Sequence, residues 1–519
     1  MALALLLLHF WLCHPALLYG IAFMLGISCY LACSLWQVIP CLCLWLPFLL
    51  IAANPRHRDF LKPLALSFIS FFTAWTYTAA YSTFPDLPSA GSTGTAYVKI
   101  KNISIQRNCF GKRWLYRCEL EQFIPELASH SIASSLPCLI SLPVKEELHG
   151  RPLANQDYWV SGKLMQTATG VYLLKVCCRT PWIAIPGTWS WAEQRYQWKE
   201  KVSTWIEAQF FSSLSASFLA GLVTGKFDDS GMQQQFARFG LQHLLAISGF
   251  HFAIIASFLS LTLRLFLPTR LCTFLLLLCL GIYCFFLGPQ PSILRAWTMC
   301  SLTLLGGLLK KQSSALNSLG LALLMILGYH PLLCQELGFQ FSFATTAAIL
   351  LFYAPIQIWL SHLFPKRHLS EVLQMNSWNQ HAYCLLAFLR QGLALTLAVN
   401  LVALPMTLYY FQQFPYLSLL YNLFFPLLAS GSLCLLLLGG LFSLLPFLAH
   451  LIHRFNDVYT DFLLQFTYQV PAEVDAYLTI DAFPAFWLIF FLCCVTLAGI
   501  IWREKSHALQ STEKSFALI

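Results

Sequence analysis

Long apolar runs separated by short polar stretches dominate this chain. A helix that crosses a membrane needs about 20 mostly apolar residues. Runs that approach this length occupy residues 16–34, 36–53, 61–81, 237–263, 271–288, 292–309, 314–330, 337–361, 387–411, 417–446 and 485–502. The run 417–446 is too long for one straight crossing, and a bend at Pro426 or Gly431 would make it a bent or re-entrant pair. The pattern predicts a polytopic α-helical membrane protein of about 10–11 spans.

One region interrupts the apolar pattern with the alternation of β-strands. TAYVKIKNISI (95–105) and WLYRCELEQF (114–123) flank the turn NCFGK, and PCLISLPV, DYWVSGKLMQ and GVYLLKVCC follow. About five short strands in a stretch of this length favour a small β-rich barrel of the OB type. Residues 189–212 then place aromatic and charged side chains at helical spacing, which predicts an amphipathic helix in the outer interface.

These patterns divide the chain into five regions. They are N-terminal transmembrane helices (1–82), an extracytoplasmic OB-like loop domain (83–188), the interfacial helix (189–212), a second transmembrane domain (213–502) and a cytoplasmic tail (503–519). The N-terminus lacks the basic region of a cleaved signal peptide, so we expect it to be retained.

Composition and charge support this assignment. The chain is 58% hydrophobic and 10% charged, with a mean hydropathy of +0.65, whereas soluble proteins carry about 25% charged residues. Lysine and arginine collect in cytoplasmic loops, and here they cluster at Arg56, Arg58, Lys62, Arg264, Arg270, Lys310, Lys311, Lys366, Arg367, Arg503 and Lys505. Counting crossings from either side places residues 83–205 outside a plasma (inner) membrane.

The loop domain is basic and aromatic. Residues 83–205 contain 14 Lys and Arg against 9 Asp and Glu. Basic grooves with aromatic stacking platforms are typical of sites that bind single-stranded nucleic acid. The candidate DNA-binding residues are Lys99, Lys101, Arg107, Lys112, Arg113, Trp114 and Arg117, with Phe110 and Tyr116 as further aromatic groups. A solvated basic face is the plainer alternative, and the five loop cysteines leave free thiols and disulfides both open.

Polar groups inside the predicted spans are candidate channel residues, because burying them in lipid is costly. We expect an outer vestibule and channel built from Lys226, Asp228, Asp229, His243, Ser248, His251, Arg295, Glu336, Gln340 and Asn422. Packed histidines, an Arg295 that snorkels to the interface and ordinary helix caps would explain the same residues without function. Ser248 and His251 also suggest a serine hydrolase, although AISGF lacks the G-x-S-x-G pattern.

Four motifs occur in an informative order. They are LVTGKFDDSGMQQQFARFGLQHLLAISGFH, GPQPSILRAWTM, HPLLCQELGFQFSFA and LPMTLYYFQQFPYLSLLYNLFFP. This succession resembles the membrane domain of the ComEC/Rec2 competence family over about residues 206–500. The resemblance implies an inner-membrane channel for DNA uptake in natural transformation. Many members also carry a metallo-β-lactamase-like domain with an H-x-H-x-D-H motif, which is absent here, so we expect no enzyme activity. The disulfide of the family's loop stays unassigned.

The sequence thus predicts a channel that passes single-stranded DNA into the cytoplasm. Expected partners are single-stranded DNA, membrane lipid, a DNA receptor outside, a motor or strand-binding protein inside and, as an open point, further copies of the chain. No cofactor or metal is expected, because no Cys-x-x-Cys pair or nucleotide-binding loop occurs. The rival hypotheses are an intramembrane serine hydrolase and a transporter of lipids or small solutes.

Overall fold

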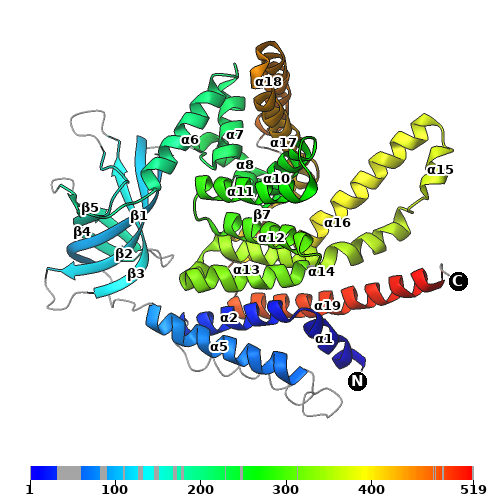
Figure 1. Ribbon diagram of the computed structural model, residues 1–519, viewed down its shortest axis with the longest axis horizontal. Helices are drawn as coiled ribbons and strands as arrows, with labels where there is room; N and C mark the ends of the chain where they lie inside the picture. The colour runs from blue at the N-terminus through cyan, green and yellow to red at the C-terminus, as the bar shows by residue number, and fades with distance from the viewer. Residues whose placement is uncertain are drawn as a thin grey trace.

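A β-barrel lies at one end of a bundle of helices, and the helix α6 (Ala192–Glu207) joins the two (Figure 1). This computed structural model describes residues 2–31, 60–81, 91–108, 111–126, 132–144, 151–166, 172–176, 181–227, 229–245, 249–311, 314–471, 473, 475–481 and 484–516. The predicted span 36–53 lies outside the described residues.

The barrel is built from five strands and a short sixth. The strands are β1 (Ser92–Asn108), β2 (Gly111–Pro125), β3 (Ile132–Pro143), β4 (Tyr158–Gln166), β5 (Tyr172–Val176) and β6 (Ile183–Ala184). Their order is β1-β2-β3-β5-β4-β6, and β1 also pairs with β4, which closes the sheet on itself. Every pairing is antiparallel except that of β3 with β5. The predicted OB-type barrel is confirmed.

Strand alternation fills the barrel. Val98 and Ile100 of β1, Leu120 of β2, Ile140 of β3 and Val160 of β4 point inward and are almost completely buried. The intervening residues face outward, as a period of two requires. This alternation is the signal by which the strands were predicted from the sequence.

Helices form the rest of the molecule. Those of the N-terminal region are α1 (Ala2–Cys13), α2 (Pro15–Leu31) and α5 (Leu61–Tyr81). After the barrel and α6 come α7 (Ser213–Thr224), α8 (Ser230–Arg238), α9 (Gln242–Leu245), α10 (Gly249–Arg264), α11 (Thr269–Leu287), α12 (Pro291–Leu308), α13 (Ala315–Tyr329), the 3-10 turn η2 (Pro331–Gln335), α14 (Leu337–Leu363), α15 (Leu369–Leu373), α16 (Ser377–Phe411), α17 (Leu417–Leu441), the 3-10 turn η3 (Phe442–Leu444), α18 (Pro446–Tyr468) and α19 (Ala485–Phe516). A two-stranded ribbon, β7 (Gln413–Pro415) with β8 (Tyr477–Thr479), joins two loops.

A polytopic membrane protein is confirmed, although fewer helices meet a strict criterion than the 10–11 predicted. Among the described residues, α11, α14, α16, α17 with η3, and α19 are long and apolar enough to cross a membrane, and α1 with α2, bent by 90°, adds a sixth. The apolar helices α10 and α13 are shorter than a full crossing. Both helices nevertheless lie within predicted spans, residues 237–263 and 314–330, apart from the last residue of α10.

Two predicted spans differ from the structure. Residues 237–263 are divided among α8, α9 and α10, because Gly240 adopts a left-handed backbone with φ of 64° and ends the first of these helices. Most of the run 417–446 is one continuous helical segment, Leu417–Leu444, which is long and apolar enough to cross a membrane once, rather than a bent or re-entrant pair. Pro426 lies inside α17, and tilt accommodates a helix longer than the bilayer is thick.

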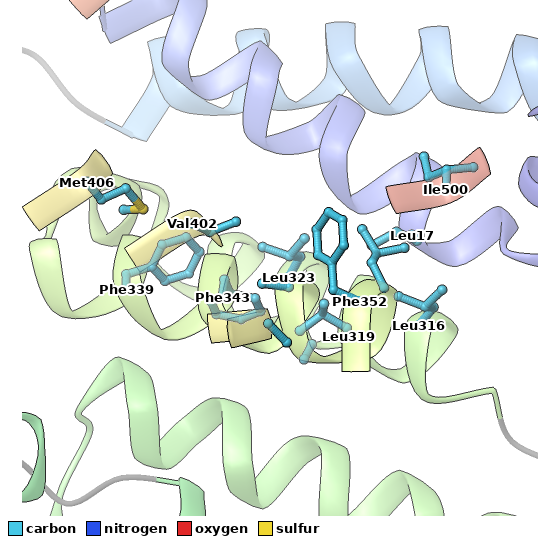
Figure 2. Packing of buried hydrophobic residues seen from close by; sticks show 14 of the residues in the cluster. Leu17, Leu316, Leu319, Leu323, Phe339, Phe343, Phe352, Val402, Met406 and Ile500 are labelled. Carbon is cyan, nitrogen blue, oxygen red and sulfur yellow. The ribbon is translucent and has the colours of Figure 1, made fainter. Parts of the chain in front are cut away.

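The largest core joins both halves of the sequence. Leu17 of α2, Leu319 of α13, Phe352 of α14 and Ile500 of α19 pack into one apolar cluster (Figure 2). The backbones of α2 and α13 are in contact there, since a Cβ placed on Gly320 would lie only 2.3 Å from the carbonyl of Ala16. Small residues allow such close approach between helices in membranes.

Candidate functional site

A buried ion pair ties α6 to the barrel. Two nitrogens of Arg151 donate to the carboxylate of Glu193 at 2.7 and 2.6 Å, and the backbone N–H of Ala154 donates to the same carboxylate at 2.9 Å. Burial alone would raise the pKa of Glu193, but these bonds outweigh it and hold the pKa below its usual value. The barrel is therefore fixed at the start of the helix that leads into the membrane domain.

The charged outer face of β1 and β2 lies toward the helical domain. Lys99 pairs with Glu121 at 3.1 Å and Lys101 pairs with Glu119 at 2.8 Å. Glu119 also lies 3.6 Å from the ring of His330, just after α13. Two of the predicted DNA-binding lysines are thus neutralised by neighbours, and the face that carries them adjoins the ends of the membrane helices.

The other predicted DNA-binding cations differ in their surroundings. Arg113 donates to the hydroxyl of Ser141 at 2.7 Å and to its carbonyl at 3.2 Å. Lys112 and Arg117 are exposed and form no ion pair within the described part of the chain. The side chain of Arg107 lies outside the described residues. Two cations of the set therefore remain open to an anionic ligand.

The predicted aromatic platform is wrong in one position. Tyr116 is completely buried in the barrel, where its hydroxyl donates to the carbonyl of Pro152 at 2.8 Å. Trp114 is half-buried and packs edge-on against Tyr196 of α6, with the guanidinium of Arg151 4.6 Å from its ring. Phe110 lies outside the described residues. On β2, bases of a nucleic acid could therefore stack only on the exposed part of the Trp114 ring.

Arg295 is buried where three helices meet. It lies in α12, donates to the carbonyl of Ser342 in α14, and leaves its Nε without a partner among the described residues. A Cβ on Gly249 of α10 would lie 2.7 Å from its Nη2, so glycine leaves room for the guanidinium. The side chain does not snorkel to the interface, because it is only 9% exposed.

Two histidines of the predicted set lie on α9 and α10. His243 is exposed and bonds to the carbonyl of Gly240 at 3.2 Å, while His251 is buried. They are close enough to interact electrostatically. Ser248, the predicted third member of this stretch, lies outside the described residues. The structure brings together two of the three residues.

Asn422 extends the polar groups onto α17. Its Oδ1 is buried and has no partner within the described parts of the chain, and the same holds for the hydroxyl of Ser418 one turn earlier. A Cβ on Gly240 would lie 2.5 Å from the Cβ of Ser418, which places this face against the turn before α9. We call the set on these packed helices the polar seam: His243, His251, Arg295, Ser342, Ser418 and Asn422.

The remaining predicted vestibule residues make contacts elsewhere. Lys226 pairs with Glu200 of α6 at 2.7 Å, and Asp229 caps α8 by accepting from the N–H of Gly231 at 2.8 Å. Asp228 lies outside the described residues. Glu336 caps α14. Gln340 donates to the carbonyl of Cys334 at 3.0 Å and accepts from the hydroxyl of Tyr410.

The polar seam offers open hydrogen-bonding groups. Buried polar atoms are nearly always paired, so the unpaired Arg295, Ser342, Ser418 and Asn422 atoms are suited to water or a polar ligand. No group of three or more His, Cys, Asp or Glu within the described residues has the geometry to hold a metal ion. In the barrel, Cys118 and Cys138 face each other across β2 and β3 as free, buried thiols.

A family profile, described as Competence protein, matches residues 222–506. The chain belongs to the competence protein family. Its predicted resemblance to that family is confirmed. A relative from Bacillus subtilis (strain 168), ComE operon protein 3, is 28% identical over 279 residues, which cover 53% of this chain and 32% of the relative. The chain therefore matches about a third of that relative's length, and no solved structure matches it.

The competence-family region contains every residue of the polar seam. Sequence reasoning missed Ser342 and Ser418, although both lie within motifs that were singled out, GFQFSFA and YLSLLYN. A serine in an apolar run is an ordinary helix residue. These two stand out only because the structure shows their hydroxyls buried without a hydrogen-bond partner among the described residues. The available signal was the position of each serine beside a predicted site residue, Gln340 in the first motif and Asn422 in the second.

Proposed function

We propose that this protein passes single-stranded DNA through the plasma (inner) membrane into the cytoplasm during natural transformation. The observation that carries the proposal is the family match over residues 222–506, because this region holds five of the candidate membrane helices among the described residues and the whole polar seam. In this account the barrel receives the strand and the seam provides polar contacts along its route. Strand cutting is not part of the proposal.

The arrangement of charges supports an outside position for the barrel. The barrel adjoins the end of α13 at His330 and the end of α11, where Lys199 of α6 donates to the carbonyl of Leu287 at 2.8 Å. The basic clusters Lys310–Lys311 and Lys366–Arg367 follow the opposite ends of α12 and α14, and α15 and the C-terminus lie away from the barrel (Figure 1). Positive loops favour the cytoplasm.

The route of the strand follows from where polar groups are open. Lys112 and Arg117 are exposed on β2. The positive charge of Arg117 is near enough to Glu336 to stabilise the negative charge of its carboxylate. Glu336 precedes α14, the helix whose Ser342 carbonyl holds Arg295. Phosphates that bind the barrel would therefore be near the helix that leads to the seam. Such binding weakens as salt concentration rises.

Complementation of a deletion strain tests the proposal. The wild-type chain should restore transformation, and the double variant Lys112→Gln with Arg117→Gln should lower it at unchanged membrane abundance. Lys201→Gln, an exposed cation on α6, is the matched control and should transform normally. A deletion strain that transforms like its parent would overturn the proposal. Activity lost in Ser248→Ala alone, with normal uptake in the barrel variant, would favour the hydrolase.

A further inference from the structure

Two cavities adjoin where the barrel meets α11. The first, of about 490 Å³, lies between the barrel, the start of α6 and the ends of α11 and α12, and it is lined by Asp157, Arg195 and Trp297 among others. The second, of about 960 Å³, continues along α11 toward the centre of that helix. Gly281 and Phe285 line both. A single elongated ligand can therefore occupy the two cavities together.

The first cavity carries an arginine, Arg195, that forms no ion pair with any described acidic residue. Nη2 of Arg195 donates to the carbonyl of Lys101 at 2.5 Å, and its Nε is buried without a partner among the described residues. Lys199 lies nearby, and burial followed by the charge of Arg195 lowers its pKa to about 8. Two cations that repel each other in a partly dry site favour an anion beside them.

The same cavity offers one more donor and one acceptor. The indole Nε1 of Trp297 and the Oδ1 of Asp157 are both buried without a described partner. The other carboxylate oxygen of Asp157 accepts from the hydroxyl of Tyr97 at 3.1 Å. Lys99 and Lys101, which also line the cavity, are already paired with glutamates. The open groups thus suit a ligand that carries both a negative and a positive end.

The second cavity is suited to a hydrocarbon chain. Leu277, Leu278, Ile282 and Phe286 of α11 form one wall, and Trp198 and Val202 of α6 form the other. From residue 277 to residue 285 a helix rises about 12 Å, which is long enough for much of an acyl chain. This wall is the surface of a membrane-spanning helix, so lipid can enter from the side.

We propose that the two cavities bind one phospholipid with an amine-bearing headgroup. Its phosphate accepts hydrogen bonds from Arg195 and Trp297, its ammonium donates to Asp157, and an acyl chain lies along α11. A nucleotide of a DNA strand would satisfy the phosphate contact, but it has no aliphatic part to fill the apolar cavity. The lipid would fill the space between barrel and bundle, beside the helix that connects them (Figure 1).

Native mass spectrometry of the purified full-length protein tests this site. The wild type should retain one phosphatidylethanolamine, and added isotopically labelled phosphatidylethanolamine should displace it at least 5-fold better than labelled phosphatidylcholine or phosphatidylglycerol. The choline headgroup cannot donate a hydrogen bond to Asp157, and the glycerol headgroup has no positive charge. This competition uses only the native chain, so it does not depend on how any variant folds.

Two substitutions separate the charged and the apolar parts. Arg195→Gln removes the phosphate contact, and Gly281→Leu places a side chain where the cavities join. Each should lower retention at least 5-fold. The matched controls are Lys201→Gln on α6 and Gly307→Leu, whose Cβ meets nothing within 4 Å, and both should retain the lipid.

Three results would overturn the inference. They are equal retention of all three phospholipids by the wild type, loss of lipid in the controls to the same degree as in the site variants, and displacement of the lipid by a short single-stranded oligonucleotide. DNA uptake is not a readout here. Failure of this site would therefore leave the proposed transport function untouched.

Discussion

The joint between the barrel and α6 differs from the polar seam in how its polar groups are paired. At the joint, Arg151 of the barrel and Glu193 of α6 satisfy each other through two short bonds. In the polar seam, Arg295 keeps an unpaired Nε and Asn422 an unpaired Oδ1. A paired group stabilises the fold, whereas an unpaired one costs stability and is available to a ligand or water. We therefore expect the first set to matter for folding and the second to matter for the proposed transport.

Glu193→Gln should give the largest loss of stability. It leaves the buried Arg151 charge without its partner, which costs about 3–5 kcal/mol. The apparent melting temperature in detergent measures this loss, and Glu207→Gln at the exposed end of α6 is the control. An equally small change in melting temperature in both variants would show that the pair of Arg151 and Glu193 does not stabilise the fold.

The same residue sets a pH dependence. Because the pKa of Glu193 is below the usual 4.5 in the folded protein, its contribution is complete above pH 4.5 and is lost as the pH falls through the folded pKa. The melting temperature of the wild type should fall as the pH is lowered through this range. The Gln variant should show less of that fall, and identical profiles would contradict the assignment.

Lys199→Met should have the next largest effect, with the opposite sign. Burial lowers the pKa of Lys199 from 10.5 to about 8, so the unfolded chain binds more protons between these values and wild-type stability rises with pH there. The difference between these two pKa values corresponds to about 3.4 kcal/mol, and the loss of the bond from Lys199 to the Leu287 carbonyl offsets about 1–1.5 kcal/mol of it. At pH 7 the variant should therefore be more stable by about 2 kcal/mol. The gain should shrink above pH 8. Lys201→Met should change little, and a destabilised Lys199→Met at pH 7 would contradict the account.

Local patterns predicted the fold where one physical constraint dominated. The run 61–81 is α5 (Leu61–Tyr81), because lipid requires an unbroken apolar helix. Alternation located β1 to β5. Tyr116 was misassigned although its alternation with the buried Cys118 and Leu120 places it inside the barrel. Gly240 lay inside an apolar run, so its turn was missed.

Other features depend on tertiary contacts and leave little trace in the sequence. The helix α18 was missed because Asn456, Asp457 and Thr460 interrupt its apolar residues, yet these groups are buried against other helices. Asp457 accepts from the backbone N–H of Phe211 at 2.9 Å, some 246 residues away in sequence. The meeting of Arg295 with Ser342 is equally non-local. Residue types indicated candidates, but only the fold shows which have partners.

Asn422→Leu should have the smallest effect on stability. Its Oδ1 has no described partner, so an apolar side chain of similar volume should change the free energy of unfolding by less than about 1 kcal/mol. Asn456→Leu is the matched comparison. The side chain of Asn456 donates to the carbonyl of Ser432 at 3.1 Å and accepts from Thr460 at 3.1 Å, and its loss should cost about 2–3 kcal/mol. Equal losses would erase the distinction between paired and unpaired groups.

The most direct test of the central claim is DNA uptake by Arg295→Gln, measured together with the abundance of the protein in the membrane. Gln retains a hydrogen-bond donor for the Ser342 carbonyl and removes the charge. The account predicts wild-type abundance with uptake reduced at least 10-fold, and partial recovery in Arg295→Lys. Wild-type uptake at wild-type abundance, or loss of the protein from the membrane, would contradict a transport role for the polar seam.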